Sequence, residues 1–253
     1  MRWTPILLAA ALAAGPAAVA ATRIPPHVAA AVASPARASE RGADARRKPA
    51  ELLAFTGVKR GDKVLELIPG YGYFTHIFSG IVGPKGRVYA VWPEPYAKQA
   101  VPNVKDLRAQ SATPAWRNIT VLVQPAAKLT APEPLDLVFT SQNYHDYPDE
   151  FMGRIDPMVF NRAVYRALKP GGIFVVIDHA AQAGSGMRDT DTLHRIDPET
   201  VKRQVIAAGF VYEGAYDGLR NRADDHRLTV FDKKIRGRTD QFAFKFRKPH
   251  RRR

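Results

Sequence analysis

The sequence contains no cysteine and is short of acidic residues. Without cysteine, disulfide bonds and thiolate metal sites are excluded. Against 38 lysine and arginine residues the chain has only 24 aspartate and glutamate residues, so its formal net charge is +14. A charge balance of this kind favours anionic surroundings, such as nucleic acid, lipid headgroups or an acidic substrate.

Much of the excess positive charge lies near the two ends of the chain, at 41–48 and at 247–253. Runs of like charge are usually solvated, so we expect 247–253 to be a basic tail. Weak contact of this tail with anionic surfaces is the alternative. No platform of aromatic residues accompanies the tail, and nucleic acid is therefore not an expected partner.

The chain has only a short apolar run near its start, below the about 20 residues that spanning a bilayer requires. It begins with Arg2, a shorter uncharged run at 6–14, and the small-residue segment Ala18-Val19-Ala20. These features are typical of a secretory signal peptide, here 1–20. We expect an exported protein, periplasmic or secreted, and an uncleaved membrane anchor is the alternative.

The remaining sequence predicts an arm followed by one globular domain. Residues 21–48 are rich in alanine, proline and arginine, and we expect a linker or flexible arm there. Residues 49–246 alternate apolar runs with helical segments. The predicted strands are 63–68, 87–92, 118–123, 135–140, 173–177, 210–215 and 228–231, with a last edge strand at 242–246. Strands separated by helices predict an α/β fold, Rossmann-like and doubly wound, with a mostly parallel sheet and helices on both faces.

In such sheets a ligand binds beyond the carboxyl ends of the strands. Glu66 lies near the carboxyl end of the first predicted strand, and the turn Gly70-Tyr71-Gly72 follows that strand. Glycine lets the backbone approach a ligand closely, and the following helix offers unpaired N–H groups. A dinucleotide fingerprint requires a third glycine where this chain has Thr75. An acid at Glu66 faces the amino end of a cationic amino-acid ligand, which favours S-adenosylmethionine.

Several segments resemble the motifs of class I S-adenosylmethionine-dependent methyltransferases. They are 64–75, 83–91, 135–138 and 168–172. Segments 143–146, 194–197 and 231–237 are similar to a narrower group of exported bacterial proteins described as methyltransferases. The resemblance implies a seven-stranded sheet with an antiparallel last strand, S-adenosyl-L-methionine as cofactor, and methyl transfer to an unidentified small-molecule acceptor. It assigns cofactor binding to Glu66, Gly70, Tyr71 and Gly72.

One part of the family pattern is missing. The second strand of these enzymes usually ends in an acid that binds the ribose hydroxyls, whereas this chain has Trp92 there and Glu94 two residues later. Glu94 is the candidate ribose ligand, with Trp92 stacked on adenine. The alternative is that Trp92 fills the core and Glu94 is solvated.

The loop after the fourth strand carries the candidate catalytic residues. Our hypothesis is that Asn143 or Tyr144 orients the acceptor and that His145, which titrates near neutral pH, removes its proton. The alternative is that Tyr144 packs in the core and His145 caps a turn with Asp146.

Other functions stay open at this stage. His179 and His194 follow the fifth strand, but their spacing matches no metal signature, so no metal site is predicted. A non-catalytic exported binding protein that retains the fold is the second hypothesis, because S-adenosylmethionine is made in the cytoplasm. A nicotinamide oxidoreductase is disfavoured by the absent third glycine.

Overall fold

The computed structural model describes residues 23–125 and 127–250, so the predicted signal peptide at 1–20 lies outside the described residues. The strands are β1 (Lys63–Leu67), β2 (Arg87–Pro93), β3 (Ile119–Gln124), β4 (Leu135–Ser141), β5 (Leu168–His179), β6 (Val211–Ala215) and β7 (Gln241–Arg247). The α-helices are α1 (Pro26–Val32), α2 (Asp44–Arg47), α3 (Pro49–Thr56), α4 (Tyr73–Val82), α5 (Glu94–Gln99), α6 (Val101–Ser111), α7 (Pro157–Ala167), α8 (Thr190–Leu193) and α9 (Pro198–Ala207). The 3₁₀ helices are η1 (Pro35–Ala43), η2 (Pro114–Trp116), η3 (Tyr144–Asp146), η4 (Glu150–Met152) and η5 (Asp217–Leu219).

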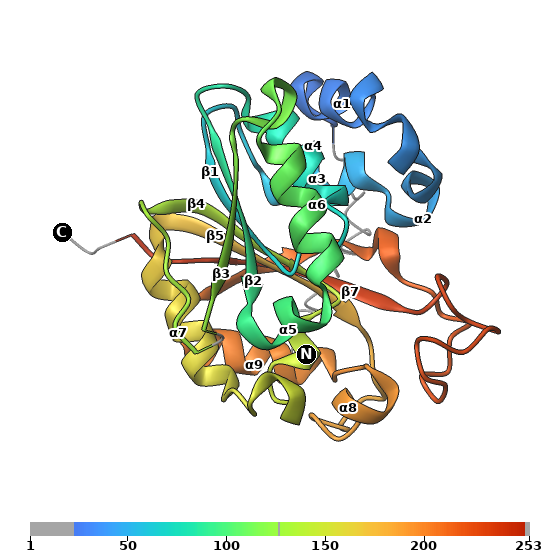
Figure 1. Cartoon of the computed structure of the whole chain (residues 1–253). Coiled ribbons are helices and arrows are strands. Elements are labelled where there is room, and N and C mark those ends of the chain that lie inside the picture. The colour runs from blue at the N-terminus through green and yellow to red at the C-terminus, as the bar shows by residue number, and fades with distance from the viewer. Residues whose placement is uncertain (1–22, 126, 251–253) are drawn as a thin grey trace, which may run out of the picture.

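The strands form one seven-stranded sheet in the order β3-β2-β1-β4-β5-β7-β6 (Figure 1). β1 pairs in parallel with β2 and β4, and β5 extends the parallel part beside β4. β7 runs antiparallel to both β5 and β6. The predicted fold class is therefore confirmed, including the antiparallel last strand.

Two strand predictions at the end of the chain are wrong in detail. Residues 228–231 form a bend and a turn and not a strand. Residues 242–246 belong to β7, which lies between two neighbours and not at the edge. Phe242, Ala243 and Phe244 are all buried, as expected for a strand covered on both faces.

Helices cover both faces of the sheet, and side-chain alternation divides the core into two clusters. In β1, Val64 packs in the cluster shared with α1, α3 and α4, whereas Leu65 and Leu67 pack in the cluster shared with α7 and α9. Successive side chains of a strand point to opposite faces, so one strand contributes to both clusters. Figure 1 shows α1 and α4 on one side of the sheet and α7 and α9 on the other.

The expectation of a linker or flexible arm at 21–48 is wrong for most of that segment. Residues 26–47 form α1, η1 and α2, and α1 packs on α4. Val28 is fully buried, and Ala31 lies so close to Gly80 that a Cβ on that glycine would come within 3.1 Å of it. Pro26 and Pro35 do not interrupt helices, because each stands at a helix start, where no backbone N–H is needed.

We expect Val28→Ala to lower the free energy of unfolding by about 1–3 kcal/mol, because it removes buried methyl groups and leaves a cavity under α1. The urea unfolding midpoint measures this loss. Ala30→Lys, on the exposed side of the same helix, should change stability by less than about 0.5 kcal/mol. Equal effects of the two substitutions would contradict the docking of α1.

The expected basic tail at 247–253 is also partly incorporated into the fold. Arg247 is the last residue of β7 and pairs with Glu213. The Lys248 ammonium donates to the Tyr165 carbonyl oxygen at 2.7 Å. Residues 251–253 lie outside the described residues. Within 23–250, leaving out residue 126, no helix combines the length and apolarity that crossing a membrane would require.

Candidate functional site

A cleft of about 750 Å³ opens at the carboxyl ends of β1, β2, β4 and β5, where the sequence analysis expected the ligand. The predicted site residues that line it are Glu66, Gly70, Tyr71, Asn143 and His145. Gly72, Glu94 and Tyr144 are not among the residues that line this cleft. The structure therefore brings most of the predicted site together and separates three of its members.

Glu66 is the buried acid of the cleft. Its side chain lies at the carboxyl end of β1 with 3% of the residue exposed, and the Thr75 hydroxyl of α4 donates a hydrogen bond to it. Burial raises the pKa of Glu66 to about 8, although the Thr75 hydrogen bond and the Arg47 guanidinium both lower it. Because burial disfavours the charged form of Glu66, a cation that binds beside it stabilises the carboxylate.

Arg47 enters the cleft from α2, in the segment that the sequence analysis expected to be a flexible arm. Its guanidinium lies 4.7 Å from the ring centre of Tyr73, and its buried Nε atom has no hydrogen-bond partner. Burial lowers the pKa of Arg47. Sequence reasoning missed this residue because its position depends on how α2 docks against α4.

The glycine turn divides into a part that faces the ligand and a part that faces the protein. Gly70 has φ 61°, and a Cβ there would meet nothing within 4 Å, so the backbone is open to the cleft. Gly72 has φ 86°, and a Cβ there would come within 3.0 Å of the His76 and Leu107 side chains. The packing at the start of α4 therefore already requires a glycine at position 72. Ile68 adopts φ 52° without closing the cleft, which it lines.

The end of β2 corrects the predicted ribose ligand. Pro93 ends the strand and Glu94 begins α5, so its side chain borders a separate groove beside Lys98 and Val101. Trp92 lines the main cleft instead, with the residue fully buried and its indole Nε1 left without a partner. The ring of Tyr96, which sequence reasoning missed, lies 6.0 Å away. An aromatic donor thus occupies the place of the usual acid.

The loop after β4 presents Asn143 to the cleft and withdraws Tyr144. Asn143 is 8% exposed, and its Oδ1 atom has no hydrogen-bond partner. The Tyr144 hydroxyl accepts from Asn161 at 2.7 Å and pairs with Gln204 at 3.1 Å. Tyr144 therefore packs in the core, as the alternative interpretation held, and it is not among the residues that line the cleft.

His145 is held by two carboxylates. Its Nδ1 atom lies 2.8 Å from Asp178, and its Nε2 atom lies 3.2 Å from Asp146. Burial lowers the pKa of His145, but the two carboxylates raise it by more than that, so the pKa lies at about 10. An imidazolium with both nitrogens engaged has no site to accept a proton. The geometry therefore does not support the predicted role of His145 as general base.

His194 joins this group from the residue after α8. It has φ 52°, and its Nδ1 atom lies 4.0 Å from Asp146. His145, Asp146 and His194 each offer one ligand atom, and these atoms all lie within 4.8 Å of one another. No metal site was predicted from the sequence, where His179 and His194 were considered and their spacing matched no metal signature. His145 and Asp146 are adjacent in η3, whereas His194 comes from a distant part of the chain.

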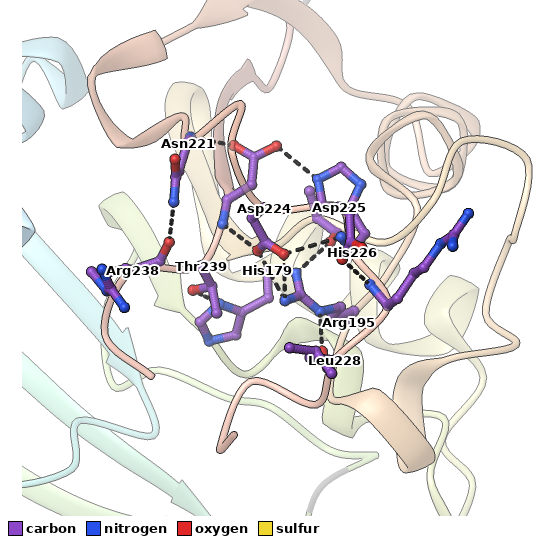
Figure 2. A network of polar contacts seen from close by, with 12 residues as sticks. His179, Arg195, Asn221, Asp224, Asp225, His226, Leu228, Arg238 and Thr239 are labelled. Atoms are coloured by element: carbon purple, nitrogen blue, oxygen red, sulfur yellow. Dashed lines mark hydrogen bonds and ion pairs between the residues drawn. The ribbon is translucent and has the colours of Figure 1, made fainter. Parts of the chain in front are cut away.

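A buried ionic network holds one wall of the cleft in place (Figure 2). Arg195 and Asp224 are both buried and pair at 2.9 Å, and Asp224 also accepts from the Asp240 backbone N–H. These contacts fasten the two ends of the segment 224–240. Val230 and Phe231 of that segment line the cleft, and the Phe231 ring lies 4.8 Å from the His194 ring.

We expect Glu66→Gln to become more stable than the wild type as the pH rises. The unfolded chain ionises Glu66 near pH 4.5, whereas the folded protein keeps the proton up to about pH 8. Unfolding releases a proton between these values, so wild-type stability falls as the pH rises through this window. The Tm difference between variant and wild type should widen by several degrees from about pH 5 to about pH 9. A Tm difference that does not change with pH would indicate that the Glu66 carboxyl group is exposed to solvent in the folded protein.

Comparison with known proteins finds similarity to methyltransferases. No protein-family model matches the chain. The chain is 31% identical over 121 residues to the protein-L-isoaspartate O-methyltransferase of Ignicoccus hospitalis, which is 47% of this chain and 48% of that protein. It thus spans about half the length of the curated relative it matches.

Solved structures cover far more of the chain. A SAM-dependent methyltransferase of Aquifex aeolicus aligns with a TM-score of 0.54 and 18% identity, over 85% of this chain and 94% of its own. The chain has the class I methyltransferase fold. The cyclase SpnF aligns with a TM-score of 0.58 and 16% identity, over 85% of this chain and 82% of its own. At such identities the likeness concerns the fold alone, and function depends on the site.

Proposed function

We propose that the cleft binds S-adenosyl-L-methionine and that the protein transfers its methyl group to a small-molecule acceptor. The observation that carries this proposal is the buried Glu66 carboxylate, which lines the cleft beside the open backbone of Gly70. The Glu66 carboxylate and the Gly70 backbone together suit a ligand that combines an amino acid, a positive charge and an adenosyl group. The curated relative named as an O-methyltransferase supports the same reaction.

Unpaired polar atoms on the cleft wall complement this ligand. Buried polar groups rarely lack partners, so each one marks a place where a ligand atom is expected. We assign Glu66 to the ligand's ammonium group and the Arg47 guanidinium to its carboxylate. Trp92 offers its unpaired indole N–H to the adenosyl group.

Catalysis in this proposal rests on positioning. Methyl transfer proceeds by an in-line approach, and holding two reactants in line supplies much of the rate. The unpaired Asn143 Oδ1 accepts a hydrogen bond from the acceptor's nucleophilic group. No side-chain base is required of His145 for an acceptor that attacks through a lone pair.

The second candidate is a binding protein that keeps the fold without methyl transfer. Two observations favour it: the paired state of His145, and the likeness of this fold to SpnF, whose name denotes a cyclase. In that case the cleft retains the adenosyl ligand but releases no product.

Calorimetry with S-adenosylmethionine, S-adenosylhomocysteine and NAD⁺ tests the proposal. We expect both adenosyl ligands to bind at one site per chain and NAD⁺ not to bind. Binding of NAD⁺ alone would refute the cofactor assignment. Formation of S-adenosylhomocysteine with a library of small acceptors then separates the enzyme from the binding protein.

We further propose that the protein is exported after cleavage behind Ala20. The support is the signal-like sequence at 1–20, which lies outside the described residues. Mass spectrometry of the protein from fractionated cells tests this proposal. We expect the mature chain to begin at Ala21 and to lie outside the cytoplasm, and an intact amino terminus in the cytoplasmic fraction would refute it.

A further inference from the structure

His145, Asp146 and His194 converge on one side of the cleft. The nearest atoms they offer, two imidazole nitrogens and one carboxylate oxygen, all lie within 4.8 Å of one another. A single ion about 2.0–2.2 Å from each atom fits such a triangle after small side-chain movements. All three residues line the cleft, so the group is not sealed in the core.

Asp178 holds His145 in the orientation that a metal ligand needs. One Asp178 oxygen lies 2.8 Å from His145 Nδ1, and the other accepts from the His145 backbone N–H at 2.8 Å. A metal-bound histidine typically donates its second ring N–H to a carboxylate, which fixes the ring and raises its basicity. His145 Nε2 is thereby directed at Asp146 and His194.

His194 adds a second independent sign of a built site. Its backbone adopts φ 52°, a conformation that costs energy for a residue with a Cβ. The side chain keeps 29% of its surface exposed and stands against the Phe231 ring, on the wall held by the network of Arg195 and Asp224. The strained backbone and this packing together direct an imidazole toward the other two ligands.

The chemistry of the three ligands selects the kind of ion. Two imidazoles and one carboxylate suit Zn²⁺ and neighbouring divalent transition metals, whereas Mg²⁺ and Ca²⁺ prefer oxygen ligands. Three protein ligands leave an open coordination position, as in catalytic zinc sites.

We propose that His145, Asp146 and His194 bind one divalent transition metal ion, with Asp178 as the orienting partner of His145. The ion replaces the proton between His145 Nε2 and Asp146, because an imidazole binds metal only in its neutral form. Metal binding is independent of the proposed function. That the open position binds an oxygen of the methyl acceptor is an extension that rests on the proposed function.

Equilibrium dialysis of the tag-free chain against Zn²⁺, followed by elemental analysis, tests the site. We expect one Zn²⁺ per chain, and Co²⁺ in its place should show the visible absorption of a low-coordinate N/O site. His194→Ala should weaken Zn²⁺ binding by about 10- to 100-fold or more, since loss of an outer partner already has that effect. Asp146→Asn should also weaken Zn²⁺ binding.

His27→Ala removes an imidazole from α1 that does not line the cleft, so it is the control for unspecific zinc binding and should leave the affinity unchanged. Thermal unfolding shows whether each variant is folded. Absence of stoichiometric Zn²⁺ binding by the wild type, or equal binding by folded His194→Ala, would overturn the proposal. Titration of S-adenosylmethionine into the metal-free protein reports on the proposed function alone, so the two failures are distinguishable.

Discussion

Glu66→Ala is expected to raise the dissociation constant for S-adenosylmethionine by about 10- to 100-fold, since a hydrogen bond to a charged group contributes about 1.5–3 kcal/mol. In the proposed function the Glu66 carboxylate, at the carboxyl end of β1, binds the ligand's ammonium group, and because it is buried, water replaces it poorly. Isothermal titration calorimetry at about pH 9, where Glu66 is ionised in the folded protein, measures the effect most directly.

Glu94→Ala is the matched control. Glu94 was the predicted ribose ligand, but its side chain borders a different groove. We expect its removal to leave the dissociation constant within about twofold of the wild type, as for a surface substitution. A large loss of S-adenosylmethionine affinity in Glu94→Ala, with no loss in Glu66→Ala, would assign ribose binding to Glu94 of α5. That result would contradict the assignment of the ligand to the cleft.

Arg195→Met is expected to lower stability by about 3–5 kcal/mol, because it leaves the Asp224 carboxylate buried without its partner. The two side chains are 0% and 1% exposed. For a chain of this size the loss corresponds to a fall in Tm of about 6–20 °C. Differential scanning calorimetry measures it, and the wall formed by Val230 and Phe231 should loosen in the same variant.

An exposed ion pair provides the comparison. Arg154 and Glu150 lie 2.9 Å apart, but their side chains are 74% and 83% exposed. Glu150→Gln should change the free energy of unfolding by less than about 1 kcal/mol, since exposed pairs contribute little. Similar effects of Arg195→Met and Glu150→Gln would show that the segment 224–240 is not held by its buried network.

The local sequence was sufficient to predict most strands of the sheet, because their signals are local. The apolar run of β1 and the proline after the N-cap of α9 both indicate structure without knowledge of distant residues. The same holds for Glu66 and Gly70, which adjoin one strand and reach the ligand edge through the general geometry of parallel sheets. These predictions needed no contact between separate segments.

Errors arose where the direction of a side chain depends on a neighbour far away in the chain. Tyr144 and His145 are adjacent, yet one turns to Asn161 in the core and the other lies between two carboxylates. Glu94 leaves the cleft because a helix begins there. In each case packing decides which of two adjacent side chains faces the ligand, and no periodic pattern records that choice.

Sequence alone therefore determined the architecture and the position of the glycine turn at 70–72, since both depend on hydrophobic periodicity and on backbone preferences of adjacent residues. Tertiary structure alone decided the docking of α1 and α2, the place of Arg47 in the cleft, and the meeting of His145, Asp146 and His194. These features join residues from separate loops and helices. Long-range burial and charge pairing determine them, and the order of residues along the chain does not.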